Sequence, residues 1–236
     1  MDPRVLYNAA SDGKLGLVRR LVRGGADVDW ADEEGRTPLF VTAGKGHAAV
    51  VRCLGKELGA AVNQANNEGT TPLWVAAENG HLSVVRCLGK ELGAAVNQAC
   101  EDGETPLYVA AEHGRMDVVR YLVTDLHAAV NQAKNNGDSP VGIAAANGHD
   151  EVAQFLTRHG ADIRAEPALG TAADRAAPEL AAWLKTRYCA NPGCDQSAPK
   201  KCTKCQKVFY CCQACLLAHW PTHKVACRAD RKRRAR

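Results

Sequence analysis

The sequence predicts a mostly α-helical protein, in which a solenoid of stacked repeats is followed by a small cysteine-rich module. Two observations lead to this prediction. A short motif recurs every 34 residues through most of the chain, and eight of the 11 cysteines fall within the last 48 residues. A constant period of this length is typical of stacked supersecondary units, each of which buries its apolar face against its neighbours.

The repeated motif is a Thr-Pro-Leu-like segment, followed at fixed offsets by two small residues, a glycine and two apolar residues. Proline fits the first turn of a helix, small residues let helices approach closely, and glycine ends a helix in a left-handed conformation. Each unit is therefore expected to contain a helix, a turn and a second helix. The four clearest copies begin at Thr37-Pro38-Leu39, Thr71-Pro72-Leu73, Thr105-Pro106-Leu107 and Ser139-Pro140-Val141.

This pattern resembles the ankyrin repeat family, and the resemblance covers roughly residues 4–187. It implies an ankyrin-repeat solenoid of five repeats plus a degenerate capping repeat. In three repeats an added residue, within segments such as Gly-Lys-Glu-Leu-Gly, is expected to lengthen the end of the outer helix. The predicted array occupies residues 1–187, with repeats at about 4–35, 36–69, 70–103, 104–137 and 138–166 and a cap at 167–187.

The histidine that usually follows Thr-Pro-Leu in this family is absent here. Its position is taken by Phe40, Trp74, Tyr108 and Gly142. The three aromatic side chains have two interpretations: they fill space between repeats, or they form an aromatic binding stripe. Both remain open at this point.

Two residue types that often carry chemistry are expected to be structural in the array. Cys53 and Cys87 occupy equivalent outer-helix positions and are interpreted as packing residues, and Cys100 as a loop thiol. The isolated histidines occupy the Gly-His turn of the ankyrin family and are not expected to act as catalytic bases. They are His47, His81 and His149.

The cysteine-rich module carries eight well-spaced metal ligands. Zn²⁺ in structural sites takes four thiolate or imidazole ligands, so eight ligands make two tetrahedral sites. The order of six cysteines, one histidine and one cysteine resembles the MYND zinc finger, here residues 188–227. The family interleaves its sites. This implies one zinc on Cys189, Cys194, Cys211 and Cys215 and a second on Cys202, Cys205, His223 and Cys227.

Such a finger is expected to fold around its metal, because a segment this short buries little core of its own. The two zinc ions are predicted to be structural, since protein ligands fill every position and leave none for an activated water. A redox or disulfide cluster and a RING finger are the alternatives, and the ligand order disfavours both. Cys212 and His219 are spare candidate ligands.

The resemblance also implies peptide binding by the finger. MYND domains accept short Pro/Leu-containing segments in a groove near a glutamine and the tryptophan of the last helix. Trp220 is present in this chain, whereas Leu216 occupies the glutamine position. We expect a peptide-binding site at Leu216 and Trp220 whose specificity differs from that of the family.

A basic tail follows the finger at residues 228–236. Residues 188–236 contain 11 Lys and Arg against two Asp, whereas the preceding residues contain 19 basic and 24 acidic side chains. The tail is interpreted as a solvated segment, a nuclear import signal or a nucleic-acid contact. It contains no aromatic residue, which disfavours stacking on bases.

The concave face implied by ankyrin geometry is acidic. This face is either a well-hydrated surface or one that attracts basic segments, the protein's own tail included. Arg36 and Lys45 are the exceptions to its acidic character. Its predicted carboxylates are Glu33, Glu34, Glu68, Glu78, Glu101, Asp102, Glu104, Glu112 and Asp138.

These features favour a non-enzymatic adaptor that binds other proteins through an ankyrin surface and a zinc-dependent peptide-binding finger. The alternative is a nuclear or chromatin-associated transcriptional regulator that contacts nucleic acid through the basic C-terminal part. No catalytic constellation is visible in the sequence. With no apolar run of membrane-spanning length and no secretory signal, the protein is expected to be intracellular, in the cytoplasm or the nucleus, without a membrane partner.

Overall fold

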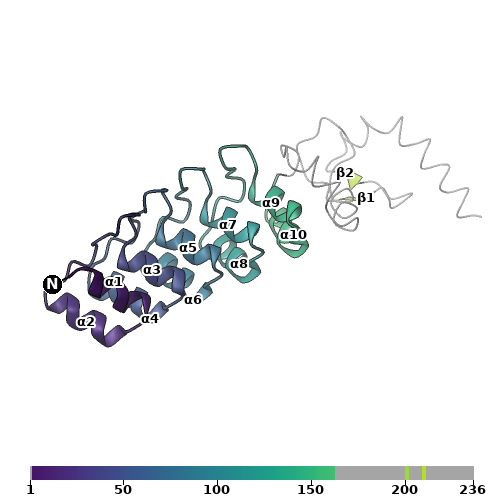
Figure 1. Ribbon diagram of the computed structural model, residues 1–236. Coiled ribbons are helices and arrows are strands. Elements are labelled where there is room, and N and C mark those ends of the chain that lie inside the picture. The colour runs from purple at the N-terminus through teal and green to yellow at the C-terminus, as the bar shows by residue number, and fades with distance from the viewer. Residues whose placement is uncertain (1, 163–199, 202–208, 211–236) are drawn as a thin grey trace, which may run out of the picture. The chain divides into compact units, whose positions relative to one another are not determined.

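The computed structural model describes residues 2–162, 200–201 and 209–210. The chain divides into two compact units, Met1–Arg175 and Ala176–Arg236. The first is built from pairs of short helices joined by turns (Figure 1). The first helices of the pairs, called inner helices here, are α1 (Arg4–Ser11), α3 (Pro38–Lys45), α5 (Pro72–Glu78), α7 (Pro106–Glu112) and α9 (Pro140–Ala146). The second, or outer, helices are α2 (Leu15–Arg23), α4 (Ala48–Arg52), α6 (Leu82–Arg86), α8 (Met116–Thr124) and α10 (Asp150–Arg158).

Four inner helices begin with the cap that the repeated motif predicts. The Thr37 side-chain oxygen accepts a hydrogen bond from the Phe40 N–H at 3.1 Å, and Pro38 is the first helical residue. Such a cap satisfies one of the amide groups that a helix start leaves without a partner. The same cap recurs at Thr71, Thr105 and Ser139.

The turn between the two helices of a repeat depends on a glycine and is fixed to the preceding repeat. Gly80 has a φ of 77°, a left-handed conformation that favours glycine. Next to it, the His81 Nε2 lies 2.9 Å from the Gly44 carbonyl oxygen, to which it donates. His47 and His149 bond carbonyls of the preceding repeat in the same way. The three histidines thus have the structural role that the sequence predicts.

The added residue of the second and third repeats is accommodated in a wide helical turn. The outer helices α4 and α6 continue as π-helices, η1 (Cys53–Glu57) and η2 (Cys87–Glu91). A π-turn, whose hydrogen bonds join residues five apart, accommodates one additional residue within a helix. The expected longer outer helix is confirmed in these two repeats, and the inserted residue sits in the π-turn rather than in additional α-helix.

The core between the helices consists mainly of alanine, valine and leucine. Leu54, Leu88 and Leu122 are completely buried along the outer helices. Cys53 and Cys87 are buried beside them, and this burial raises the pKa of both thiols. The two cysteines therefore pack as predicted.

Hairpin loops precede the inner helices and extend along one edge of the array (Figure 1). Successive loops are joined by backbone hydrogen bonds, from the Asn67 N–H to the Glu34 carbonyl, from Glu101 to Glu68 and from Asn135 to Asp102, at 2.9 to 3.0 Å. Polar side chains add further links, such as that from the Asn67 amide to the Glu33 carbonyl (2.9 Å). The hairpins thus form a continuous ladder, which fixes the spacing of the residues at their tips.

The second unit is described only at one strand pair. The strands β1 (Lys200–Lys201) and β2 (Phe209–Tyr210) are antiparallel, with Lys200 opposite Tyr210 and Lys201 opposite Phe209. The predicted cap (167–187), the eight zinc ligands, Leu216, Trp220 and the tail (228–236) lie outside the described residues. No helix of the described part is long and apolar enough to span a membrane.

Candidate interaction surface

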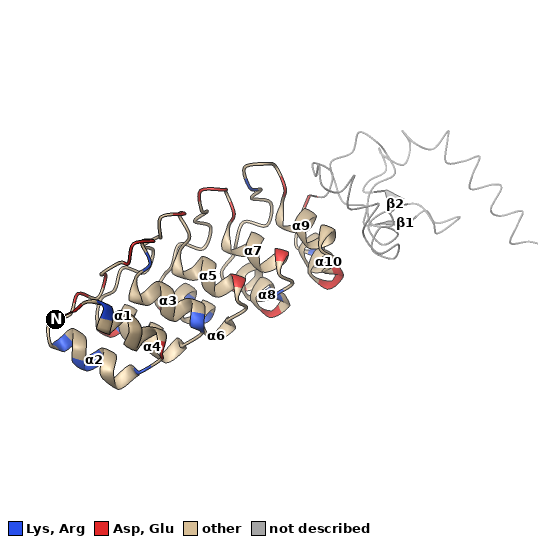
Figure 2. Ribbon diagram, in the orientation of Figure 1, with Lys and Arg blue, Asp and Glu red and all other residues tan. Residues whose placement is uncertain are grey.

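The hairpin edge of the array carries a row of exposed carboxylates. Figure 2 shows acidic residues following one another along the hairpin loops. Because the backbone ladder joins these loops, the charges are held at a constant spacing. The exposed members at the tips are Glu33, Glu34, Glu68, Glu101 and Asp102. We call these five residues the acidic edge.

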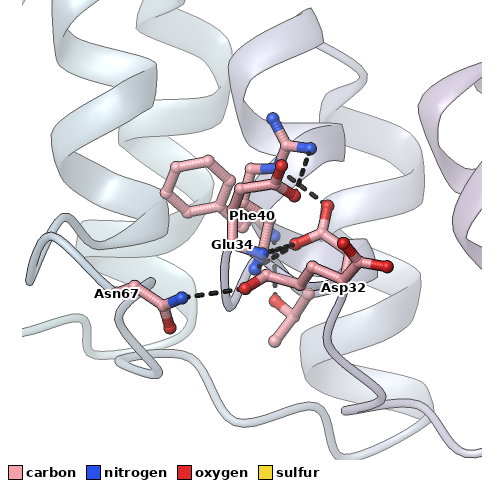
Figure 3. Close-up of polar contacts among 7 residues, drawn as sticks. Asp32, Glu34, Phe40 and Asn67 are labelled. Atoms are coloured by element: carbon pink, nitrogen blue, oxygen red, sulfur yellow. Dashed lines mark hydrogen bonds and ion pairs between the residues drawn. The ribbon is translucent and has the colours of Figure 1, made fainter.

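Of the two basic exceptions to the predicted acidic face, Lys45 is exposed at the end of α3, and Arg36 is neutralised within its own hairpin. The Arg36 guanidinium lies 2.8 Å from the Asp32 carboxylate and 3.0 Å from the Glu34 carboxylate. Figure 3 shows these contacts beside the Asn67 amide that reaches from the next hairpin. The acidic edge therefore keeps a net negative charge despite the presence of Arg36.

The other predicted carboxylates lie deeper, where the hairpins meet the inner helices. Glu78 and Glu112 end helices α5 and α7, and Glu104 and Asp138 precede α7 and α9; all four are partly buried. Burial raises the pKa of the Glu78 carboxyl. His113 and Arg115 oppose this rise, whereas the negative charges of Glu104 and Glu112 add to it. The sequence predicted one acidic face, and the structure divides it into an exposed edge and this inner cluster.

One cation reaches the inner cluster from within the array. Lys134, on the hairpin that precedes α9, lies 3.3 Å from the Glu104 carboxylate and 5.3 Å from the centre of the Tyr108 ring. The Tyr108 side chain is completely buried, which raises its pKa to about 12. Lys134 is close enough to lower this pKa but forms no well-aligned hydrogen bond with the buried hydroxyl.

The outer helices show a different arrangement of charge. Arg19 bonds Glu57 of the next repeat at 2.6 Å, and Arg52 bonds Glu91 at 2.6 Å. At the two following steps the equivalent arginines lie over aromatic rings instead. Arg86 lies 5.1 Å from the centre of the Tyr121 ring, and Arg120 lies 5.2 Å from that of Phe155. Sequence reasoning missed this series, although Arg52, Arg86 and Arg120 recur at the 34-residue period.

Comparison with known families agrees with this geometry. A family model described as ankyrin repeats matches residues 6–100 and 90–167. The chain belongs to the ankyrin repeat family. In the second unit of this ankyrin protein, a model described as MYND finger matches residues 186–227. That match spans all eight predicted ligands.

A curated relative supports the second match. The finger region is 50% identical over 34 residues to the zinc finger MYND domain-containing protein 10 homolog of Drosophila melanogaster. The aligned segment covers 14% of the ankyrin protein and 8% of that relative. The similarity is therefore one of the finger alone.

Membership of these two families indicates the general type of activity that the two units have. Ankyrin repeats and MYND fingers are protein-interaction modules that are typically non-catalytic, and the MYND finger binds zinc. In the second unit, Cys202 directly follows β1 and Cys211 directly follows β2 in the sequence. The nucleic-acid alternative gains no support from either family, and the acidic edge disfavours contact with phosphate by the array.

The ankyrin array also has an open pocket of about 420 Å³ at its N-terminal end, beside the acidic edge. Tyr7 and Trp30 meet there edge to face, with ring centres 6.1 Å apart. Asp32, Glu33 and Glu34 line the same pocket, together with Arg4 and Arg36. Its cations and carboxylates nearly balance, so its charge does not favour a ligand of either sign.

Proposed function

We propose that this protein is a non-enzymatic adaptor whose ankyrin array binds basic segments of partner proteins. The observation that carries the proposal is the acidic edge, which a backbone ladder holds at regular spacing. Complementary charge accelerates encounter and selects partners of opposite sign. The MYND finger provides a second, zinc-dependent surface for short Pro/Leu-containing segments, and joining the two surfaces brings their partners together.

Binding of a basic peptide by the full-length protein tests the first part of this proposal. A variant with Glu68→Gln and Glu101→Gln removes two charges from the acidic edge. A matched control with Asp117→Asn and Glu151→Gln removes two exposed charges from the outer helices α8 and α10. We expect the edge variant to associate more slowly, with a weaker dependence on salt, and the control to behave like the wild type. Equal behaviour of the two variants would contradict the proposal.

The finger is proposed to hold two structural zinc ions, one on Cys189, Cys194, Cys211 and Cys215 and one on Cys202, Cys205, His223 and Cys227. Thiolates need a reducing environment to remain metal ligands, which fits an intracellular location. Elemental analysis of the purified protein should find about two equivalents per chain. Cys205→Ser should lower the content by one equivalent or more, whereas Cys100→Ser, in the array, should leave it unchanged.

The peptide site of the finger is proposed to include Trp220 and Leu216. Trp220→Ala is expected to abolish binding of a Pro/Leu-containing peptide without releasing zinc. Leu216→Gln, which restores the residue typical of the family, is expected to strengthen it. Isothermal titration with that peptide measures both effects, and unchanged affinity in the Leu216→Gln variant would rule out this position.

A further inference from the structure

The array contains an internal example of how its inner cluster holds a cation. At the end of the fourth repeat, Lys134 reaches back from the hairpin before α9 over the Tyr108 ring and pairs with Glu104. Glu112 and Asp138 add negative charge around the same ring, and both raise the Tyr108 pKa. An aromatic face with a neighbouring carboxylate is a favourable environment for a cationic side chain.

One repeat earlier, the equivalent positions keep the aromatic residue and one carboxylate but have no lysine, and Thr70 takes the position of Glu104. Trp74 occupies the position of Tyr108, and Glu78, one helical turn further along α5, occupies that of Glu112. The position of Lys134 is taken by Cys100. Among the described residues, no cation forms an ion pair with the Glu78 or Glu112 carboxylate. The nearby Arg115 donates from its Nε to the Glu78 backbone carbonyl at 2.9 Å rather than to the carboxylate. The aromatic and acidic groups are thus present here without an ion-paired cation from the described array.

The exposure of the aromatic side chain also distinguishes the third repeat from the second and the fourth. Phe40 and Tyr108 are buried, with 9% and 0% of their surface exposed, whereas Trp74 remains partly exposed. The two interpretations of the aromatic residues therefore apply to different positions. Phe40 and Tyr108 fill space between repeats, and Trp74 is available to a ligand.

Two buried polar groups indicate, independently of charge, that hydrogen bonding at this place is incomplete. The Tyr108 hydroxyl and the Trp74 indole N–H are both buried and form no well-aligned hydrogen bond within the described part of the chain. Native structures leave few such groups without a partner. The Tyr108 hydroxyl can accept a hydrogen bond from a cationic side chain, whereas the indole N–H only donates. Tyr108 is completely buried and adjoins Glu112, the carboxylate that ends its own helix.

We propose that Trp74, Glu78 and Glu112 form a receptor for one arginine side chain of the basic partner segment. The inference rests on the proposed function, because it specifies where such a segment is anchored. The guanidinium stacks on the exposed part of the Trp74 ring and donates hydrogen bonds to the Glu78 and Glu112 carboxylates. Glu104 stays paired with Lys134 and borders the receptor.

Arginine suits this receptor better than lysine for two reasons. Its planar guanidinium stacks on an aromatic face while it donates to a carboxylate, whereas an ammonium group is a compact, strongly hydrated charge. The array itself places guanidinium groups over aromatic rings at Arg86 and Arg120. The burial that raises the pKa of Glu78 also strengthens its attraction for a cation that excludes water.

The test uses the full-length protein and a fluorescent glycine-serine peptide that carries spaced arginines. A second peptide has citrulline in their place, which keeps the shape and loses the charge. Trp74→Leu and Glu78→Gln should each weaken binding of the arginine peptide about tenfold, the size expected for one desolvated cation–π or charge-assisted contact. Asp117→Asn, on the outer helix α8, is the matched control for charge and should bind normally.

The indole N–H signals of the protein give a second readout, independent of affinity. Of its four tryptophans, the one whose signal disappears in Trp74→Leu should shift on addition of the arginine peptide. The citrulline peptide should not shift it. Glu78→Gln conserves shape and removes no hydrogen bond within the described array, so it tests the receptor even if Trp74→Leu fails to fold.

The outcomes separate this inference from the proposed function. Weak binding by both variants, with the expected shift, supports the receptor. Binding that is unaffected in Glu78→Gln but reduced by neutralising the acidic edge would overturn the receptor and leave the adaptor function standing. Absence of binding to the wild-type protein would overturn both.

Discussion

Charged side chains on the outer helices of the ankyrin array have partners within the array, whereas many of those on the hairpin side do not. On the outer helices, arginines of four consecutive repeats each meet a partner in the following repeat, first Glu57 and Glu91 and then the rings of Tyr121 and Phe155. On the hairpin side, the acidic edge is exposed, and the Glu78 and Glu112 carboxylates form no ion pair in the described part of the chain.

This difference separates charges that hold the array together from charges that remain available to a partner. Paired charges on the outer side link neighbouring repeats, which is how a solenoid gains stability. The Glu78 and Glu112 carboxylates, which form no ion pair in the described part of the chain, repel one another and lose hydration, so they reduce stability. Proteins commonly tolerate such a loss at functional sites.

The largest expected effect comes from the ladder that positions the acidic edge. Gly103 has a φ of 84°, and a Cβ atom there would lie 2.8 Å from the Asn135 backbone nitrogen. Gly103→Ala should lower the free energy of unfolding by about 3 kcal/mol, because a left-handed alanine is strained and the next hairpin must move. Denaturant unfolding measures the loss.

Gly93→Ala is the control for backbone strain alone. Gly93 has a φ of 68°, but a Cβ atom there would meet nothing within 4 Å. This variant should lose only about 1 kcal/mol. Equal losses at Gly93 and Gly103 would show that contact between hairpins contributes nothing to the stability of the edge.

A smaller effect, of opposite sign, is expected at Tyr108. Its hydroxyl is buried without a well-aligned hydrogen bond. Tyr108→Phe should raise the free energy of unfolding by up to about 1 kcal/mol, because the variant no longer buries an unsatisfied polar group. A loss of stability, measured by thermal unfolding, would mean that Lys134 bonds this hydroxyl more strongly than its geometry indicates.

Breaking one outer ion pair should cost little. Arg52 lowers the pKa of the Glu91 carboxyl by hydrogen bonding and by its charge. A lowered pKa stabilises the fold above the unfolded pKa of the carboxyl, and that stabilisation is lost as the pH falls through the lowered value. Arg52→Ala should therefore reduce stability slightly at neutral pH and not at all in strong acid, and high salt should diminish the difference. A loss that persists in strong acid would point to packing by the arginine side chain instead.

Much of this architecture could be predicted from the sequence, because the residues that cap helices and form turns recur at a fixed period. The caps at Thr37, Thr71 and Thr105 follow from Thr-Pro-Leu, and the histidine turns follow from Gly-His. The acidic character of the hairpin side was also visible, since those residues lie at constant offsets from the motif.

Contacts between residues that lie far apart in the sequence could not be predicted. The link from Arg52 to Glu91 depends on how far one repeat is rotated against the next, and the position of Lys134 over Tyr108 depends on where the hairpin before α9 packs. The same is true of burial, which distinguishes the partly exposed Trp74 from Phe40 and Tyr108. Periodicity assigns all three the same place and says nothing of their exposure.

The central claim is that the inner cluster lowers the stability of the array and binds a cation, and one variant tests both parts. Because burial raises the pKa of Glu78, its charged form destabilises the fold above that pKa, and the cost disappears as the pH falls below the usual carboxyl value. In one buffer at neutral pH, Glu78→Gln should therefore show slightly higher unfolding free energy and about tenfold weaker affinity for the arginine peptide. A variant that is less stable, or that binds as tightly as the wild type, would contradict the account.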